Sequence, residues 1–384
     1  MMMKSVICNN FKVAEISDIH FGNGRVSPVR TYEHLQDVLY PLLAEVKLLI
    51  INGDTFDTLL NMNSDSGLYV AKFIDDIVNL AVEHKVYIRV VRGTFSHDRH
   101  QNRFFTVKDR GAHKLNGVDL VRVIDRITIE HFNELNIDIL YCPDDQPHKD
   151  LSQAIIDVIE SNHLKQVDLL CSHAYYEHLL PVGIPHIPHN TLSYDRLNKY
   201  VSGYMLNGHV HKPSVYQNKV VSSGSFERMD HDNDKRPVGM WMLSAERNKQ
   251  GLKWSIDFIE NKQAIPFVTF TADNYKSVED LQRSIQDYMK DLSDSGYPTS
   301  EPVYIRIHGN VTGIQDWIKS TFSNVYVTDK KVSVVQSVMV EDLDTDCDEL
   351  PTITEDNLAQ MVFDEIPEEE NMTYKEVEEI LNGL

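Results

Sequence analysis

Short apolar runs and longer stretches of helical periodicity alternate along the first two thirds of the chain. Strand-like runs rich in β-branched residues are expected at residues 13–17, 47–51 and 86–91, with helical patterns between them at residues 31–44 and 68–84. Buried strands that alternate with helices of this length are typical of βαβ units. The pattern therefore predicts an α/β domain at the beginning of the chain.

Further apolar runs extend this domain. The stretches NIDILYCP, QVDLLCSH and YMLNGHVH each end in polar residues, and GMWMLSAERNKQGLKWSIDFIE is typical of two strands around a polar turn. We therefore expect one α/β domain over residues 1–262.

The alternation of strands and helices restarts after Pro266. Over residues 263–340 the pattern predicts the order β-α-β-α-β, which indicates a small split-βαβ domain. Residues 341–384 begin with an acidic run that resembles a linker. In this tail Thr373 and Glu376 form a capping box ahead of apolar residues at helical spacing. We therefore expect a tail of short helices that docks on a partner.

Composition places the chain among ordinary globular proteins, because 42% of its 384 residues are hydrophobic and 25% are charged. The net charge of −21 is concentrated in residues 341–384, which hold 16 acidic residues and one lysine. The preceding 340 residues carry 36 basic and 42 acidic side chains, a net charge of −6. This nearly balanced body does not exclude nucleic-acid binding.

The cysteines and the apolar runs indicate the cellular compartment in which the protein is expected. The four cysteines contain no CxxC pair, which argues against a disulfide framework and against a thiolate zinc site. No apolar run approaches the ~18 residues that are needed to span a bilayer, and the first residues lack a leader pattern. We therefore expect a cytoplasmic protein without a membrane partner.

Polar phrases follow several of the predicted strands. They are SDIH, NGDTFD, GTFSHD, SHAYY and GHVH, which contain the candidates Asp18, His20, Asp54, Asp57, His97, Asp98, His173, His209 and His211. In an open α/β sheet, ligands bind at the carboxyl ends of the strands. Carboxylates and imidazoles without thiolates suit Mn²⁺, Fe²⁺ or Zn²⁺ in an open catalytic site.

Each phrase has an ordinary explanation when it is taken alone. A His-x-His pair arises easily by chance in a chain with 17 histidines, and a Gly-Asp pair after a strand is often only a helix cap. Their joint order at strand ends favours a metal site. His186 and His189 stand among prolines and are expected in a loop, and His100, His113 and His231 are expected at the surface.

The order D-x-H, G-D, H-D, H and G-H-x-H resembles the calcineurin-like metallophosphoesterase superfamily. Within it, GDTFDT and VSSGSFERMD resemble the SbcD family, the bacterial and phage counterpart of the eukaryotic meiotic recombination nuclease. The resemblance covers about residues 11–340. It implies a sandwich of two mixed sheets flanked by helices, with a small capping domain.

The resemblance also implies roles for individual residues. Asp18, His20 and His211 would hold one metal, and His173 and His209 would hold the other. Further roles fall to a bridging ligand, Asp54, to the catalytic pair His97 and Asp98, and to the DNA-contacting or structural candidates Arg99, Ser225 and Arg228.

The same resemblance implies cofactors and partners. The expected metal is Mn²⁺, two per subunit, with Mg²⁺ as a second possibility. The expected partners are DNA ends, an SbcC-type coiled-coil ATPase and a second copy of the nuclease subunit.

One position departs from the family's pattern. An asparagine normally stands before the catalytic histidine and ligates the second metal, but here Ser96 precedes His97 and the loop is two residues longer. A serine hydroxyl is a weaker ligand than an amide carbonyl. Ser96 directly, Ser96 through water, or a backbone carbonyl could fill the position, or the site could be a relic without its metal. We favour an altered but active site, and the departure suggests a phage version acting in the host cytoplasm.

The leading functional hypothesis is a metal-dependent DNA nuclease, an exonuclease, an endonuclease or both, that works with an ATPase in recombination, repair or replication. A phosphomonoesterase or a cyclic-nucleotide phosphodiesterase could use the same metal core. A catalytically weakened scaffold for the ATPase is the alternative outside the enzymes. The GSFER phrase at residues 224–228 and the second α/β domain favour the nuclease.

Overall fold

The computed structural model describes residues 8–109, 112–144, 146–180, 190–231, 236–309 and 311–328, all within one compact unit, Met1–Ser333. The predicted tail at residues 341–384 lies outside the described residues, as do His186 and His189. Among the described residues, no helix is both long and apolar enough to cross a membrane.

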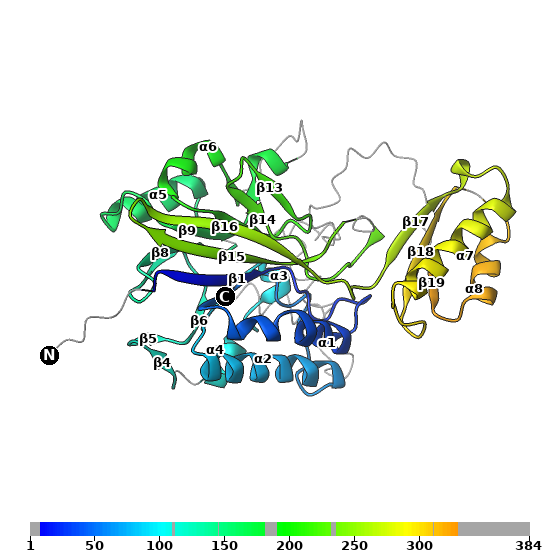
Figure 1. Cartoon of the computed structure of the whole chain (residues 1–384), viewed down its shortest axis with the longest axis horizontal. Helices are drawn as coiled ribbons and strands as arrows, with labels where there is room; N and C mark the ends of the chain where they lie inside the picture. Colours follow the sequence, from blue (N-terminus) through cyan, green and yellow to red (C-terminus); the bar gives the residue numbers. More distant parts are fainter. Residues whose placement is uncertain are drawn as a thin grey trace, which may run out of the picture. The chain divides into compact units, whose positions relative to one another are not determined.

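The first large sheet has the strand order β16-β15-β1-β2-β3-β6. Its strands are β1 (Asn10–Ile16), β2 (Leu48–Asn52), β3 (Tyr87–Val91), β6 (Val121–Ile124), β15 (Gly239–Asn248) and β16 (Gly251–Glu260). The first four are parallel, and the hairpin of β15 and β16 adds to β1 in antiparallel orientation. The helices α1 (Pro28–Val38), α2 (Asp65–His84) and α4 (Arg103–Asp109) cover one face (Figure 1).

The second large sheet has the order β13-β14-β12-β9-β8-β7. Its strands are β7 (Thr128–Phe132), β8 (Ile137–Cys142), β9 (Leu169–His173), β12 (Met205–Gly208), β13 (Ser214–Tyr216) and β14 (Val220–Ser222). The inner four are parallel, and the two edge strands are antiparallel to their neighbours. The helices α5 (Leu151–Ser161) and α6 (Tyr194–Leu197) pack on its outer face.

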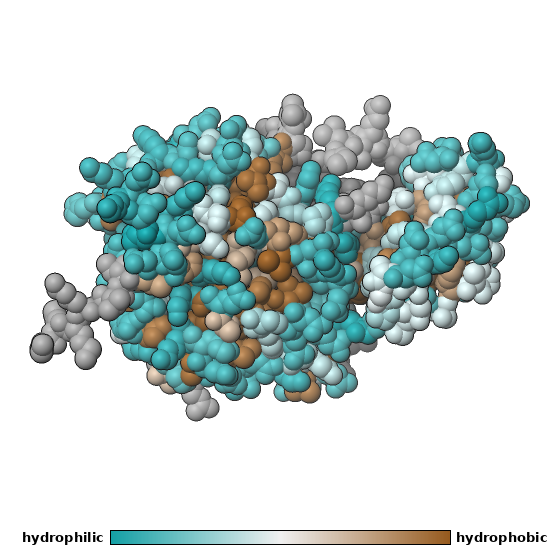
Figure 2. All heavy atoms as spheres, in the orientation of Figure 1, coloured by the Kyte–Doolittle hydropathy of each residue, from teal (hydrophilic) through white to brown (hydrophobic). Residues whose placement is uncertain are grey.

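Apolar side chains fill the space on both faces of each sheet. In β2, Leu48 and Ile50 pack between the two sheets, whereas Leu49 and Ile51 pack under the helices. A strand that is buried on both faces carries a continuous apolar run rather than an alternating one, which explains the sequence LLII. Figure 2 shows that hydrophilic residues cover most of the visible face. The predicted sandwich of two mixed sheets flanked by helices is confirmed.

A third, small sheet contains β17 (Phe267–Thr271), β18 (Val303–His308) and β19 (Val325–Thr328). The helices α7 (Val278–Asp294) and α8 (Ile314–Thr321) connect them, so the predicted β-α-β-α-β order is present. The described strands are parallel and pair in chain order, so they form two consecutive βαβ units. In a split βαβ unit, another strand would separate β17 from β18. The predicted domain boundaries at residues 262 and 340 stay predictions.

Short elements complete the described chain. They are η1 (Tyr40–Ala44), α3 (Phe95–Asp98), β4 (Lys114–Leu115), β5 (Val118–Asp119), β10 (Tyr175–Tyr176), η2 (Glu177–Leu179), β11 (Thr191–Leu192), η3 (Asn198–Tyr200) and η5 (Ala272–Asn274).

Two local expectations are wrong. The helix expected at residues 31–44 begins earlier, because Ser27 caps its first turn by accepting from the backbone of Arg30. It ends at Val38, and a 3₁₀ turn with Pro41 near its start follows. His231 is buried rather than on the surface, with its ring nitrogens 3.4 Å from Thr269 Oγ1 and 2.7 Å from Thr328 Oγ1.

Candidate metal centre

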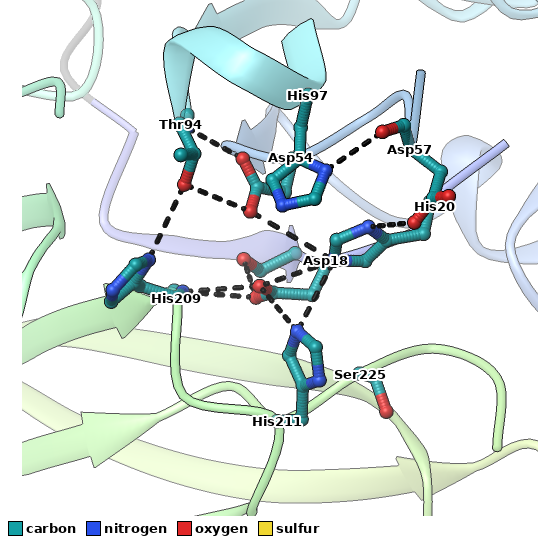
Figure 3. Close-up of polar contacts among 12 residues, drawn as sticks. Asp18, His20, Asp54, Asp57, Thr94, His97, His209, His211 and Ser225 are labelled. Atoms are coloured by element: carbon teal, nitrogen blue, oxygen red, sulfur yellow. Dashed lines mark hydrogen bonds and ion pairs between the residues drawn. The ribbon is translucent and has the colours of Figure 1, made fainter. Parts of the chain in front are cut away.

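The predicted ligands lie at the carboxyl ends of four parallel strands. Asp18 and His20 follow β1, and Asp54 follows β2. His173 is the last residue of β9, and His209 directly follows β12. Because the parallel strands of both sheets end at the same edge of the sandwich, the loops bring these side chains together with His211 (Figure 3).

The backbone at these positions is strained. Asp18, His20, Asp54 and His209 have φ angles of 50°, 51°, 45° and 75°. A residue other than glycine rarely adopts a positive φ, because its Cβ then crowds the backbone. Such conformations persist where the surrounding structure enforces them, and they gather at functional sites. Four of them within one cluster mark this edge of the sandwich as the site.

Two glycines allow the loops to approach this closely. A Cβ at Gly53, which has a φ of 93°, would lie 2.0 Å from His173 Nδ1. A Cβ at Gly93 would lie 2.1 Å from Asp54 Oδ1. Any larger residue at either position would therefore displace a candidate ligand.

The first half of the centre consists of Asp18, His20 and His211. The two imidazoles face each other, with His20 Nε2 and His211 Nε2 3.1 Å apart. Asp18 Oδ1 lies 3.9 Å from His20 Nε2 and 3.6 Å from His211 Nε2. One carboxylate oxygen and two ring nitrogens therefore converge on a common point.

The second half consists of Asp54, His173 and His209. Asp54 Oδ2 lies 3.2 Å from His173 Nε2 and 3.8 Å from His20 Nε2 in the first half. This carboxylate therefore reaches both groups, as the resemblance implies for a bridging ligand.

Hydrogen bonds behind the ligands orient the rings. His20 donates from Nδ1 to Asp57 Oδ1 at 3.0 Å, and His173 donates from Nδ1 to the carbonyl oxygen of Asn52 at 2.9 Å. In both rings Nε2 is thereby left to face the cluster. Histidine ligands of metals are commonly held in this way by a partner on the second nitrogen.

The donor set fits divalent cations. Among the described residues, His173 Nε2 is buried without a hydrogen-bond partner, although it lies 3.2 Å from Asp54 Oδ2. Buried polar atoms normally have partners, so such atoms within a cluster of carboxylates and imidazoles point to an ion. Oxygen and imidazole donors without thiolates suit Mn²⁺, Fe²⁺ or Zn²⁺.

The electrostatics of the site lead to the same conclusion. Burial by itself lowers the pKa of His20 and of His173, but neighbouring carboxylates, foremost Asp18 for His20 and Asp54 for His173, raise both pKa values to about 10. Burial raises the pKa of Asp54, but the adjacent charge of His173 outweighs it and holds that pKa below its usual range. Protons thus balance the carboxylates here, and cations would replace those protons on binding.

His97 lies beside the first half of the centre. Its Nδ1 donates to the carbonyl oxygen of Asp57 at 2.7 Å, and its ring meets that of His20 edge-on at 5.0 Å between centroids. Asp57 therefore holds both histidines, His20 through its carboxylate and His97 through its carbonyl. From the sequence Asp57 is a candidate without a defined role, and its contact with His97 runs through a backbone carbonyl, which has no signature in the sequence.

Asp98 lies behind the loop rather than in the cluster. It is fully buried and accepts from the backbone N–H groups of Phe56 at 3.1 Å and Gly93 at 2.7 Å, and from Asn102 Nδ2 at 2.7 Å. Burial raises its pKa to about 6. These contacts anchor the loop, and a direct catalytic role for Asp98 stays a prediction.

Thr94 rather than Ser96 is the loop residue whose side chain reaches the cluster. Ser96 is exposed on α3, whereas Thr94 is half-buried and touches the second half of the centre (Figure 3). The Thr94 backbone donates to Asp54 Oδ1 at 2.6 Å, and Thr94 Oγ1 donates to Asp54 Oδ2 at 3.2 Å. Thr94 is not evident from the sequence when the position is counted backwards from His97, because that count ends at Ser96. Counting forwards from Gly93 would have found it.

The three remaining candidates lie outside the cluster of ligands. Ser225 is buried, with its backbone N–H donating to the His211 carbonyl at 3.3 Å and its hydroxyl donating to the Glu227 carbonyl at 2.7 Å. Arg228 donates to the carbonyl of Ala264 at 3.0 Å. Both therefore brace the loops, whereas Arg99 is exposed at the end of α3.

No family model and no curated protein sequence matches the chain. Solved structures similar to it include GAP50, the anchor in the inner membrane complex of Plasmodium, at a TM-score of 0.38 and 12% identity, covering 67% of this chain and 86% of that one. A second is the nuclease MPE of Pseudomonas putida, at a TM-score of 0.24 and 17% identity, covering 54% of this chain and 66% of that one. A third is a cold-active protein-tyrosine phosphatase of a psychrophilic Shewanella, at a TM-score of 0.28 and 12% identity, covering 68% of this chain and 83% of that one. These scores and identities are too low to support an inference about activity, which depends on the site itself.

Proposed function

We propose that the chain is a two-cation phosphodiesterase that hydrolyses DNA. The observation that carries this proposal is the position of Asp54, whose Oδ2 lies 3.2 Å from His173 Nε2 and 3.8 Å from His20 Nε2. A carboxylate between two groups of ligands can hold two ions close together. Such a pair of ions supplies Lewis-acid polarisation of the phosphate and neutralises its charge. Mn²⁺ is the proposed metal and Mg²⁺ the alternative.

His97 is the proposed acid–base residue. A carbonyl oxygen only accepts hydrogen bonds, so the contact with Asp57 places a proton on Nδ1 of His97. Nε2 is then the nitrogen that can exchange a proton with a substrate. When the ring is cationic, this nitrogen can donate a proton to the departing sugar oxygen. The close His20 ring limits the rotation of His97 and keeps it beside the cluster.

DNA as the substrate is supported by the resemblance in the GSFER phrase and by the additional α/β domain. The exposed cations beside the site suit a phosphate backbone, since Arg99 follows α3 and Lys212 follows His211. Contacts from arginine and lysine to phosphates position a nucleic acid without reading its sequence.

Substrate competition tests this proposal. The full chain is incubated in MnCl₂ with linear duplex DNA, circular single-stranded DNA, p-nitrophenyl phosphate or cyclic AMP. We expect cleavage of DNA, and the products from the linear and circular forms separate exonuclease from endonuclease activity. Hydrolysis of p-nitrophenyl phosphate alone would indicate a phosphomonoesterase, and of cyclic AMP alone a cyclic-nucleotide phosphodiesterase. Bound Mn²⁺ without any hydrolysis would indicate a scaffold.

We also propose that residues 341–384 dock on the coiled-coil base of an SbcC-type ATPase. The support is the capping box of Thr373 and Glu376, followed by an apolar stripe. Isolated helices shorter than ~12–15 residues are marginal in water, so such a stripe needs a partner groove. Deleting residues 341–384 should weaken ATPase association and leave DNA hydrolysis by the isolated subunit unchanged. Equal affinity before and after the deletion would contradict the docking proposal.

A further inference from the structure

The loop between β3 and α3 places its two additional residues after Thr94. Gly93 is followed directly by Thr94, and α3 begins at Phe95. Phe95 and Ser96 therefore lengthen the segment between Thr94 and His97. Phe95 is 45% exposed and Ser96 is also exposed, so the additional residues turn away from the centre.

Thr94 instead points its hydroxyl into the second half of the centre (Figure 3). Thr94 Oγ1 lies 3.2 Å from Asp54 Oδ2 and 3.4 Å from His209 Nδ1. Donor atoms at about 2.1 Å from one cation are themselves roughly 3.0–3.5 Å apart. The distances from Thr94 Oγ1 to these two atoms therefore match the spacing between ligands that share one ion.

The Thr94 hydroxyl can serve both neighbours at once. Its single O–H donates to Asp54 Oδ2, and its oxygen lone pairs remain to bind a cation. The Thr94 backbone N–H donates separately to Asp54 Oδ1 at 2.6 Å, which fixes the residue at this position independently of its side chain.

We infer that the Thr94 hydroxyl is a ligand of the second cation and fills the position that the asparagine occupies in the resembling family. This inference rests on the proposed two-cation function. The first half adds the Asp18 carboxylate to the shared Asp54, whereas the second half adds only the neutral Thr94 hydroxyl, so the second cation binds more weakly than the first. The second half of the centre is then the half whose occupancy responds to the concentration of Mn²⁺.

Substitutions at Thr94 and Ser96 test the inference. Mn²⁺ binding is measured by isothermal titration calorimetry on full-length wild type, Thr94→Val, Thr94→Ser, Thr94→Asn and the matched controls Ser96→Ala and Ser96→Asn. Thr94→Val keeps the shape and the backbone contact but removes the hydroxyl, and Thr94→Ser restores it. Anomalous scattering from crystals in limiting MnCl₂ assigns each change to one half of the centre.

We expect two Mn²⁺ ions in the wild type. Thr94→Val should weaken the second ion by at least about 10-fold, Thr94→Ser should bind it like the wild type, and Thr94→Asn should tighten it. Both Ser96 variants should match the wild type. Loss of affinity for both ions in Thr94→Val would show that Thr94 only orients the shared Asp54, and would overturn the inference.

Other outcomes separate the inference from the proposed function. If the affinities of both ions were unchanged in Thr94→Val, or changed in the Ser96 variants instead, the ligand assignment would be overturned. The proposed function would not be contradicted by that result. A single ion at saturating MnCl₂ would overturn the assignment and also the two-cation part of the proposed function. Absence of any Mn²⁺ binding by the wild type would refute the proposed function together with the inference.

Discussion

The two halves of the metal centre share Asp54 but differ in their remaining donors. The first half pairs a carboxylate, Asp18, with two imidazoles, and each distance among them is below 4.0 Å. The second half also has two imidazoles, yet its outer position is occupied by the hydroxyl of Thr94. With Thr94 as the inferred ligand, the departure from the resembling family is confined to one neutral donor in one half.

The halves also differ in what holds them. In the first, the side chain of Asp57 orients His20, whereas in the second a backbone carbonyl, that of Asn52, orients His173. The same carbonyl accepts from Ser17 Oγ at 2.9 Å, and Ser17 also contacts Asp18. A side-chain substitution can therefore disturb the support of the first half alone, while the support of the second half belongs to the fold.

Removing the shared ligand should have the largest effect. Asp54→Ala leaves neither half with its bridging carboxylate, so we expect loss of at least one Mn²⁺ and of detectable DNA hydrolysis. Bound metal is measured by calorimetry and cleavage by release of labelled nucleotides. Asp65→Ala, at an acidic position in the first turn of α2, is the matched control. Two retained ions with hydrolysis intact would remove the bridging assignment.

His97→Ala tests a residue that lies beside the first half of the centre. Because His97 is proposed to act on a proton rather than to hold a cation, turnover should fall by about 10²–10⁴-fold while both Mn²⁺ ions still bind. His100→Ala provides the control, since His100 is an exposed histidine on the same loop. Normal turnover in His97→Ala would refute the acid–base role.

Much of the centre could be predicted from the sequence because strand ends are visible in it. A buried β-run followed by Asp-x-His or His-x-His places those side chains at a sheet edge, whatever the details of packing. The sandwich follows from the alternation of strands and helices in the same way. These features depend on local periodicity, which a single sequence contains.

The residues that orient the ligands could not be predicted from the sequence, for physical reasons. Asn52 acts through its carbonyl, and the direction of a carbonyl depends on the strand pairing rather than on the side chain. The exposed position of Ser96 could not be predicted, because the sequence does not show where in the loop the two additional residues lie until Gly93 and Asp98 are located in space. His231 is buried because residues 38 and 97 positions later in the chain pack on it.

Asp57→Asn should distinguish the two halves most directly. The substitution removes the charged acceptor behind His20 and keeps the Asp57 carbonyl that holds His97. Loss of such a supporting carboxylate typically costs 10–100-fold in metal affinity. We expect this loss for the first Mn²⁺ only, measured by calorimetry, with the second ion as an internal control. Equal weakening of both ions would show that the halves are not independently supported.

Glu15, Ser223 and Asn52 form a buried polar cluster next to the metal centre. Glu15 Oε1 accepts from Ser223 Oγ at 2.5 Å and from Asn52 Nδ2 at 3.1 Å. Glu15 is fully buried, and this burial raises its pKa from 4.5 to about 7, although both hydrogen bonds oppose the shift. A raised carboxyl pKa means that the folded protein binds the Glu15 proton more tightly than the unfolded chain does. The resulting stabilisation is complete below pH 4.5 and is lost as the pH rises through about 7.

Glu15→Gln should therefore change stability rather than the balance between the halves, with the smallest effect on hydrolysis of the four substitutions. A neutral amide of the same shape does not ionise, so the variant should escape the loss of about 3 kcal/mol that the wild type undergoes between pH 4.5 and pH 8 through this group. Urea unfolding in a chelator at pH 5 and pH 8 measures the difference, since both proteins share every other titrating group. The free energies of unfolding of the two proteins should diverge with rising pH, with Glu15→Gln becoming more stable relative to the wild type. Any change in Mn²⁺ affinity should be the same for both ions. An identical pH dependence of the free energy of unfolding in both proteins would show that ionisation of Glu15 does not destabilise the fold. A change in the affinity of one Mn²⁺ ion alone would show that the polar cluster of Glu15 supports only one half of the centre.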